Sequence, residues 1–101
     1  MAKIQILDQG FIYQDENNRF GYCGWPTVCS DKNGVLYAGY SGFRTRHICP
    51  FGKATLQKST DGGKTWSAQI VAQDTLLDDR DISVLSLPDG RLYLGWLVND
   101  F

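Results

Sequence analysis

The stretch Ser59-Thr60-Asp61-Gly62-Gly63-Lys64-Thr65-Trp66 decides the fold class of this chain. In a tight turn the Asp61 carboxylate can accept backbone N–H hydrogen bonds, and Gly63 can take a positive φ without steric cost. The Trp66 ring can then pack into the sheet beside the turn. These residue types at this spacing predict a hairpin turn that joins two β-strands. The residues assigned to this structural turn, rather than to substrate contact, are Ser59, Asp61, Gly63, Thr65 and Trp66.

A hairpin pattern occurs twice, at an offset of 56 residues. Pro26–Tyr40 aligns with Ile82–Trp96, and each copy holds a strand, an Asn-Gly or Asp-Gly turn, and a second strand. The identical pairs are Val28/Val84, Ser30/Ser86, Gly34/Gly90, Leu36/Leu92, Tyr37/Tyr93 and Gly39/Gly95. Such turns are strong hairpin signals, and a repeated hairpin predicts stacked β-blades. Blade repeats usually take about 40 to 50 residues, so the excess predicts one long loop, Ser41–Gly52.

The same signals place the strands of the blades. Period-two alternation and the turns predict one four-stranded antiparallel blade within residues 24–72. Its strands are expected at residues 26–30, 35–41, 53–58 and 66–72. A second blade is expected to start near Asp81, within residues 81–101, and to end after its second strand near Val98. Two apolar stretches within residues 1–18, at 3–7 and 10–14, are expected to form N-terminal strands, which would pair with the last blade of a closed propeller.

Composition excludes several classes of function. The chain is 43% hydrophobic and 13% aromatic, which is not the composition of a disordered protein. A net charge of -1 without a basic stripe gives no reason to expect a nucleic-acid partner. No apolar run is long enough to cross a membrane. The start of the chain lacks the long apolar region of a secretory signal, and the sequence leaves the compartment open.

Three cysteines, Cys23, Cys29 and Cys49, form no C-x-x-C pair and no metal-type spacing. We expect buried or neutral thiols, with a single disulfide or a catalytic thiol as less favoured alternatives. No metal and no cofactor are expected.

Residues 59–66 match the S-x-D-x-G-x-T-W Asp box of sialidases and related β-propellers at every defined position. The stretches Arg44–Lys53 and Thr75–Asp81 also resemble segments of bacterial sialidase-like proteins. The resemblance implies an all-β, six-bladed propeller, of which residues 1–101 would supply the N-terminal one and a half to two blades. It further implies a glycoside hydrolase of exo-sialidase (neuraminidase) type that acts on terminal acidic sugars. Many Asp-box propellers are not enzymes, so the motif itself speaks for the fold.

The order of the strands sorts the loops. Successive connections in an antiparallel meander alternate between the two ends of the strands. Ser41–Gly52 and Gln73–Asp81 should therefore lie together, at the end opposite the Asp box. Together these loops contain arginines, which can grip a sugar carboxylate, and carboxylic acids, which can protonate a leaving oxygen.

The resemblance also suggests which arginines bind substrate. Sialidases open the first blade with an Arg-Ile-Pro motif whose arginine binds the sugar carboxylate, and this chain has Gly24-Trp25-Pro26 there. The internal repeat pairs Gly24 with Arg80, so Arg80 is the first substrate-binding candidate. Arg46 is the second. Arg44 is expected to be a solvated loop residue.

Proton transfer is assigned to Asp79, with Asp78 as the alternative, by position in the loop, and to His47 as a second donor with an unperturbed pKa near neutrality. The alternative for His47 is a loop histidine bonded to backbone. Asp78 and Asp81 are assigned to substrate binding. The alternative for this carboxylate cluster is a turn paired with Arg80.

Three functional hypotheses follow. The chain is part of a sialidase-like glycoside hydrolase, a non-catalytic Asp-box propeller that binds glycan or protein, or an inactive truncated fragment. Trp25 either stacks on a sugar ring or caps the core. The open strand edge of the second blade predicts self-association.

Overall fold

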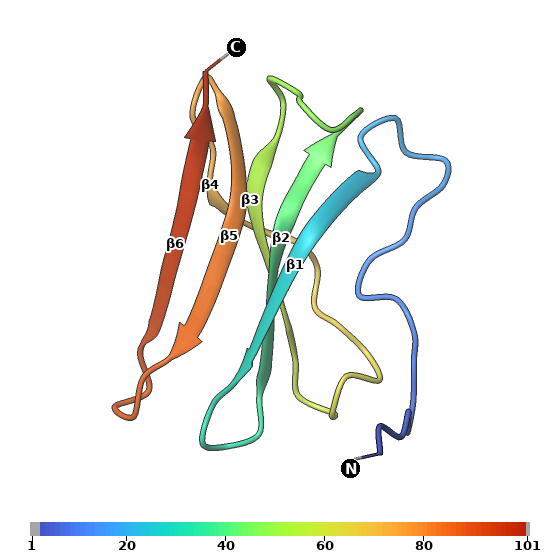
Figure 1. The fold of residues 1–101 in the computed structure, drawn as a ribbon, viewed down its shortest axis with the longest axis vertical. Helices are drawn as coiled ribbons and strands as arrows, with labels where there is room; N and C mark the ends of the chain where they lie inside the picture. Colours follow the sequence, from blue (N-terminus) through green and yellow to red (C-terminus); the bar gives the residue numbers. More distant parts are fainter. Residues whose placement is uncertain (1–2, 101) are drawn as a thin grey trace.

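The computed structural model describes residues 3–100, which form six β-strands and no helix. The strands are β1 (Tyr22–Ser30), β2 (Leu36–Arg44), β3 (Lys53–Ser59), β4 (Ile70–Gln73), β5 (Asp78–Ser86) and β6 (Leu92–Asn99). The first four make an antiparallel sheet in chain order, and β5 pairs with β6 in a second sheet (Figure 1). The predictions of an all-β chain and of a four-stranded antiparallel sheet are confirmed.

The internal repeat is a repeat of structure. In the first hairpin Thr27 pairs with Gly39, and in the second Ser83 pairs with Gly95, so both partners move by the same 56 residues. The turns repeat as well. The N–H groups of Asp31 and Gly34 make the same backbone hydrogen bonds as their repeat equivalents, Leu87 and Gly90. Gly34 and Gly90 have φ of 81° and 90°, a conformation in which glycine meets no Cβ clash.

Each hairpin also has a bulge at the same position. The register of β1 shifts between Gly24 and Thr27, and that of β5 shifts between Arg80 and Ser83. Trp25 and Asp81 are repeat equivalents, and both have a φ of 55°. Few non-glycine residues adopt this conformation, which costs about 1–3 kcal/mol and persists where the surroundings determine it.

Strand boundaries differ from the predicted ones at the end that carries the long loops. β2 continues to Arg44 instead of ending at residue 41, because Gly42 still pairs with Lys53 in β3. β5 begins at Asp78 rather than near Asp81, because its first residues pair with the end of β6. In the other direction, β4 is shorter than the predicted 66–72: the Asp-box turn ends at Trp66, and residues 67–69 lie between it and the strand. The glycine and charged residues at the end of β2 and the charged residues at the start of β5 read as loop in the sequence, so both strand extensions were missed.

The predicted N-terminal strands are absent. Residues 3–20 contain no strand, and Ile4 and Leu7 are 96% and 86% exposed. The closest tie to the first sheet is a long hydrogen bond, 3.5 Å, from Gln57 Nε2 to the carbonyl of Ile12. Apolar alternation forms a strand only with ladder hydrogen bonds to a neighbouring edge, and residues 3–20 make none with a described strand, although residues 10–13 lie near β1.

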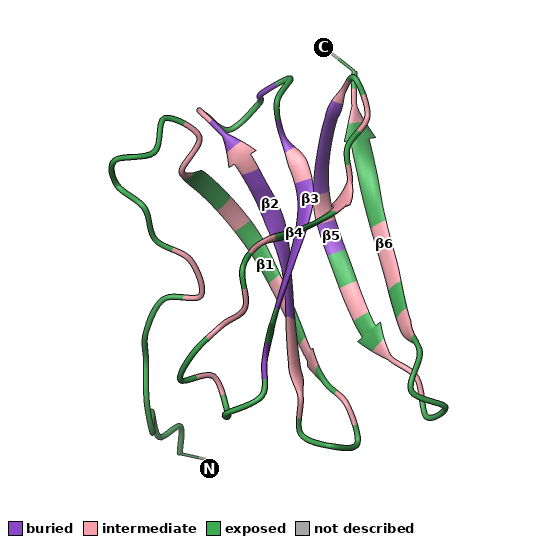
Figure 2. Ribbon diagram, turned by 180° about the vertical axis from the view of Figure 1, so that it is seen from behind, coloured by how far each residue is buried: buried purple, intermediate pink, exposed green. Residues whose placement is uncertain are grey.

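The second sheet packs on the first through β5, which lies closest to β1 and β2. Thr27 Oγ1 donates to the Ile82 carbonyl (3.0 Å), and the Asp81 N–H donates to Ser41 Oγ (2.9 Å). Burial concentrates in β2, β3 and the first half of β5, as Figure 2 shows. The buried apolar residues are Ala38, Tyr40, Cys49, Ala54, Leu56 and Ile82.

Candidate functional site

The two long connections meet at one end of the molecule, as the antiparallel order predicts. The β2–β3 loop and the β4–β5 connection lie at the upper end in Figure 1, and the Asp-box turn lies at the lower end. Lys53 Nζ lies 2.8 Å from Asp74 Oδ2, and the Asp79 N–H donates to the Gly52 carbonyl (3.2 Å). We call this region, residues 44–53 and 74–81 with Trp25, the long-loop end.

The centre of the long-loop end is a buried ion pair between Arg44 and Asp78. Both side chains have no exposed surface, and Arg44 Nη2 contacts Asp78 Oδ1 directly. Arg44 also donates to the backbone carbonyls of His47 (2.8 Å) and Asp79 (3.3 Å). The prediction that Arg44 is solvated is therefore wrong. Its position at the end of β2, facing the start of β5, removes it from water.

Gly52 is the residue that makes room for this pair. A Cβ at position 52 would lie 1.9 Å from Arg44 Nη2 and 2.5 Å from Asp78 Oδ1, closer than any real contact. The loop backbone therefore passes directly over the pair, and the Cys49 N–H donates to Asp78 Oδ2 (3.3 Å). The ion pair joins the end of β2, the following loop and the start of β5.

Arg80 lies next to this pair and is only 8% exposed. Its guanidinium makes two ion-pair contacts, with Asp78 Oδ2 at 3.6 Å and Asp81 Oδ1 at 3.7 Å, both longer than hydrogen bonds. Within residues 3–100 it donates no hydrogen bond. Its carbon Cζ lies 4.7 Å from the centre of the Trp25 ring, a cation–π distance. Arg80 is thus held in place by the ring and the two carboxylates while its N–H groups remain unused.

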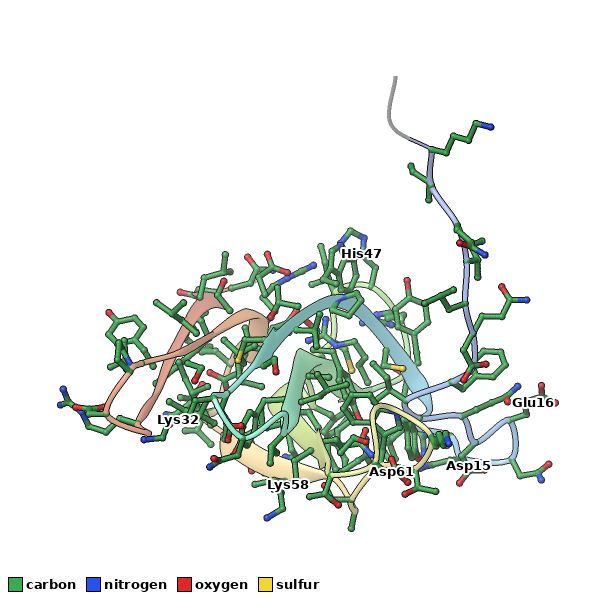
Figure 3. The ribbon with its side chains drawn as sticks, turned by 90° about the horizontal axis from the view of Figure 1, so that it is seen from below. Asp15, Glu16, Lys32, His47, Lys58 and Asp61 are labelled. Atoms are coloured by element: carbon green, nitrogen blue, oxygen red, sulfur yellow. The ribbon has the colours of Figure 1, made fainter. Side chains whose placement is uncertain are left out.

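Trp25 lies over Arg80, and His47 stacks on Trp25. The two ring centroids are 4.7 Å apart at 30°, and both side chains are exposed, Trp25 by 37%. Figure 3 shows the labelled His47 side chain at the outer margin of the molecule, away from Asp61. The positive φ of the bulge turns Trp25 toward the long-loop end. The structure therefore brings together five of the predicted site residues. They are Trp25, His47, Asp78, Arg80 and Asp81.

Asp79 is placed differently from its neighbours. Because side chains alternate along a strand, Asp79 lies on the face of β5 opposite Asp78 and Arg80. It is wholly buried, and its Oδ2 accepts hydrogen bonds from the N–H (2.6 Å) and hydroxyl (3.0 Å) of Thr75. Its Oδ1 is buried without a hydrogen-bond partner in residues 3–100. As placed here, Asp79 organises the β4–β5 connection.

Arg46 and Asp81 lie at the margins. Arg46 is exposed, and its Nε donates to the carbonyl of Ile48 within the same loop (2.9 Å). Asp81 is partly exposed on the bulge of β5, and its Oδ1 is buried without a hydrogen bond among the described residues. A groove of about 320 Å³ runs between the two bulges. It is lined by Trp25, Pro26, Thr27, Asp81, Ile82 and Ser83.

The Asp-box turn has the geometry expected of a structural turn. Asp61 Oδ1 accepts hydrogen bonds from the N–H groups of Lys64 (3.0 Å) and Thr65 (2.9 Å) and from the Ser59 hydroxyl (2.8 Å). The Thr65 hydroxyl donates to Oδ2 (2.5 Å). These bonds, led by that of the Thr65 hydroxyl, hold the pKa of Asp61 well below its usual range. Gly63 has a φ of 92°, as the pattern requires, and Trp66 is partly buried beside it.

The three cysteines carry free thiols. Burial raises the pKa of Cys23 and Cys29. Burial also acts to raise the pKa of Cys49, but hydrogen bonds with Thr45 and the backbone, together with the Arg44 charge, outweigh it and lower that pKa. Among residues 3–100 no three metal-ligating side chains gather, and no helix long and apolar enough to cross a membrane is found.

The residues that sequence reasoning missed are Arg44 and Gly52. A signal for Arg44 was present, because the loop order already placed its loop beside the acidic stretch 78–81. A lone arginine after a glycine-rich strand and a carboxylate cluster at the same end are candidates for a buried pair. Gly52 carried no such signal, since the close approach of its backbone to the pair is visible only in three dimensions.

Comparison with known proteins adds no relative: a scan of family models, a search of curated proteins and a search of solved structures each returned no match to this chain.

Proposed function

We propose that this chain contributes two consecutive blades, one complete and one partial, to a sialidase-like β-propeller that recognises and hydrolyses a terminal acidic sugar. The repeated hairpin, with its shared register, turn and bulge, supports the propeller, because stacked repeats keep the same internal geometry. The packing of β5 on β1 and β2 is consistent with consecutive blades.

The observation that carries the proposal is the state of Arg80. Its guanidinium is almost buried and is held by a ring and two carboxylates, yet its N–H groups are free to donate. Such a group is suited to binding a ligand carboxylate through two parallel hydrogen bonds. Trp25 adds an exposed aromatic face on which a sugar ring can stack, and the groove beside Asp81 provides a hydroxyl acceptor. His47 is exposed at the same place, and its imidazole is a candidate proton donor.

A binding module without catalysis is the second candidate, and the placement of Asp79 favours it. A general acid must come within hydrogen-bond reach of the leaving oxygen. Asp79 is buried on the other face of β5 and bonded to Thr75. In the hydrolase proposal, either substrate binding moves the β4–β5 connection, or His47 supplies the proton.

Titration of the chain with the methyl α-glycoside of N-acetylneuraminic acid tests the recognition step. Arg80→Lys keeps the charge and loses the planar fork, so affinity should fall about tenfold or more, as expected for charge-assisted hydrogen bonds. The methyl ester of the same glycoside should bind wild type and variant equally. Arg91→Lys is the matched control, because Arg91 is exposed in the turn between β5 and β6 and is paired with Asp89. Unchanged affinity in Arg80→Lys contradicts the proposal.

Hydrolysis of aryl α-glycosides of N-acetylneuraminic acid by the complete propeller, to which this chain is proposed to contribute two blades, separates the two candidates. In a hydrolase, Asp79→Asn or His47→Gln should lower kcat far more than it raises KM, most strongly for poor leaving groups. Binding by the wild type without any cleavage would leave the binding module as the function.

A further inference from the structure

The carboxylate of Asp78 lies between two arginines and is shared unequally. Its Oδ1 contacts Arg44 directly, while its Oδ2 lies 3.3 Å from the Cys49 nitrogen and 3.6 Å from Arg80 Nη1. Asp78 and Arg80 are two residues apart on one face of β5, so a close bidentate pair between them is within reach. In the structure that pair is not closed. Asp78 is turned toward Arg44 instead.

We propose that Arg44 is a positioning residue that holds Asp78 away from Arg80 and so keeps the Arg80 guanidinium available to a ligand carboxylate. The inference rests on the proposed function of Arg80. Without Arg44, Asp78 would be a buried carboxylate with one long backbone hydrogen bond, and Arg80 would be the nearest cation to neutralise it. The fork of Arg80 would then be occupied from within the protein. A ligand carboxylate would have to displace Asp78 to bind.

Three features hold the Arg44 guanidinium against Asp78. Its two backbone acceptors, the carbonyls of His47 and Asp79, hold the guanidinium plane from two segments. The absence of a side chain at Gly52 lets the loop close directly over the pair. Arg44 is also fully buried, so water cannot replace its contact with Asp78. A lysine at position 44 would keep the charge but could not make this planar set of contacts.

Removal and restoration of the pair test the proposal. The chain is titrated with the methyl α-glycoside of N-acetylneuraminic acid and with its methyl ester, in wild type, Arg44→Gln, Arg44→Gln/Asp78→Asn and Arg80→Lys. Arg44→Gln should weaken binding of the acid about tenfold or more, because it closes the Asp78–Arg80 pair, and leave the ester unchanged. The double variant removes the competing carboxylate and should bind the acid within about threefold of wild type. Asp78→Asn also relieves the unpaired buried charge, so the ester is the control for a structural effect: a disturbed site would weaken binding of the acid and the ester alike.

The outcomes separate this proposal from the proposed function. Arg44 has no positioning role if Arg80→Lys loses affinity for the acid but Arg44→Gln does not. The same follows if the double variant binds the acid as weakly as Arg44→Gln. In both cases the proposed function of Arg80 stands. If wild type binds no acid, both proposals fall. Melting temperatures identify folded variants, and Arg44→Met with Arg44→Met/Asp78→Asn carries the same comparison if glutamine at position 44 prevents folding.

Discussion

Asp61 and Asp78 are both well-bonded carboxylates, yet they differ in where their partners lie. Every partner of Asp61 is within four residues of it in the chain, from Ser59 to Thr65. The partners of Asp78 include Arg44 and Cys49, 34 and 29 residues away. The first set forms as soon as the turn forms. The second requires the assembled sheets, and breaking such a buried pair typically costs about 3–5 kcal/mol.

The Asp61 turn should make stability depend on pH in the acid range. The pKa of Asp61 is lower in the folded state than the usual value of about 4, so the unfolded chain takes up the proton first as pH falls. Its contribution is complete above the unfolded pKa and is lost as pH falls through the folded one. In thermal melts, Asp61→Asn should therefore flatten the decline of melting temperature below about pH 4. Asp8→Asn, in the exposed N-terminal segment, is the control. An unchanged acid slope in Asp61→Asn would show that the turn does not stabilise the charged carboxylate.

At the scale of the element, the repeat keeps the bulge of the backbone but places different residue types in it. Trp25 and Asp81 share a φ of 55° although one is aromatic and the other acidic. The shared backbone turns both residues toward the long-loop end, where β1 and β5 lie close together. The first bulge therefore presents a ring, and the second presents a carboxylate beside Arg80.

Substitution at position 81 should reveal the backbone strain of the bulge. Asparagine tolerates the left-handed conformation, so Asp81→Asn should change the free energy of unfolding by less than about 0.5 kcal/mol. A β-branched residue is a genuine outlier at this φ, and Asp81→Val should lose about 1–3 kcal/mol in urea denaturation. Ser83→Val, on an exposed regular position of the same strand, should be nearly neutral. Equal stability of Asp81→Val and wild type would mean that the bulge relaxes freely.

For the whole molecule, a close contact between the two sheets lies at a glycine, Gly39. A Cβ at Gly39 would lie 2.9 Å from Ile82 Cγ2 and 2.9 Å from Val84 Cγ1. The repeat equivalent, Gly95 on β6, has no atom within 4 Å of such a Cβ among the described residues. The two equivalent glycines thus have different environments. β5 packs against Gly39 of the first hairpin, and no described residue packs against Gly95 of the second.

Alanine at these two positions should separate packing from strand propensity. Gly39→Ala should lower the free energy of unfolding by about 1–3 kcal/mol, the range for overpacking a core. Gly95→Ala should be neutral or slightly stabilising, since alanine loses less backbone entropy than glycine. Gly39→Ala/Val84→Ala should recover part of the loss by giving up the clashing methyl groups. Equal effects of Gly39→Ala and Gly95→Ala in chemical denaturation would contradict the close packing of β5 on the first sheet.

Much of the fold follows from short-range chemistry and could be predicted. Asn33-Gly34 and Asp89-Gly90 specify hairpin turns because glycine takes the positive φ there, and the Asp61 turn closes with its own neighbours. The 56-residue repeat then gives the same register to both hairpins. The antiparallel order of these elements is enough to place the two long loops at one end of the molecule.

Only the tertiary structure decided which charged residues at that end are buried, which are exposed and which remain free to bind. Arg44, expected in solvent, is buried because β2 runs on and β5 starts early, so that Asp78 faces it. Asp79 and Arg80 are adjacent in the chain, yet strand alternation sends one to Thr75 and the other to Trp25. The N-terminal stretch alternates like a strand, yet residues 3–20 form no strand, because they make no ladder hydrogen bonds with a neighbouring strand edge. Turns are determined by residues a few positions apart. Burial and pairing are determined by residues that meet only when the two sheets pack.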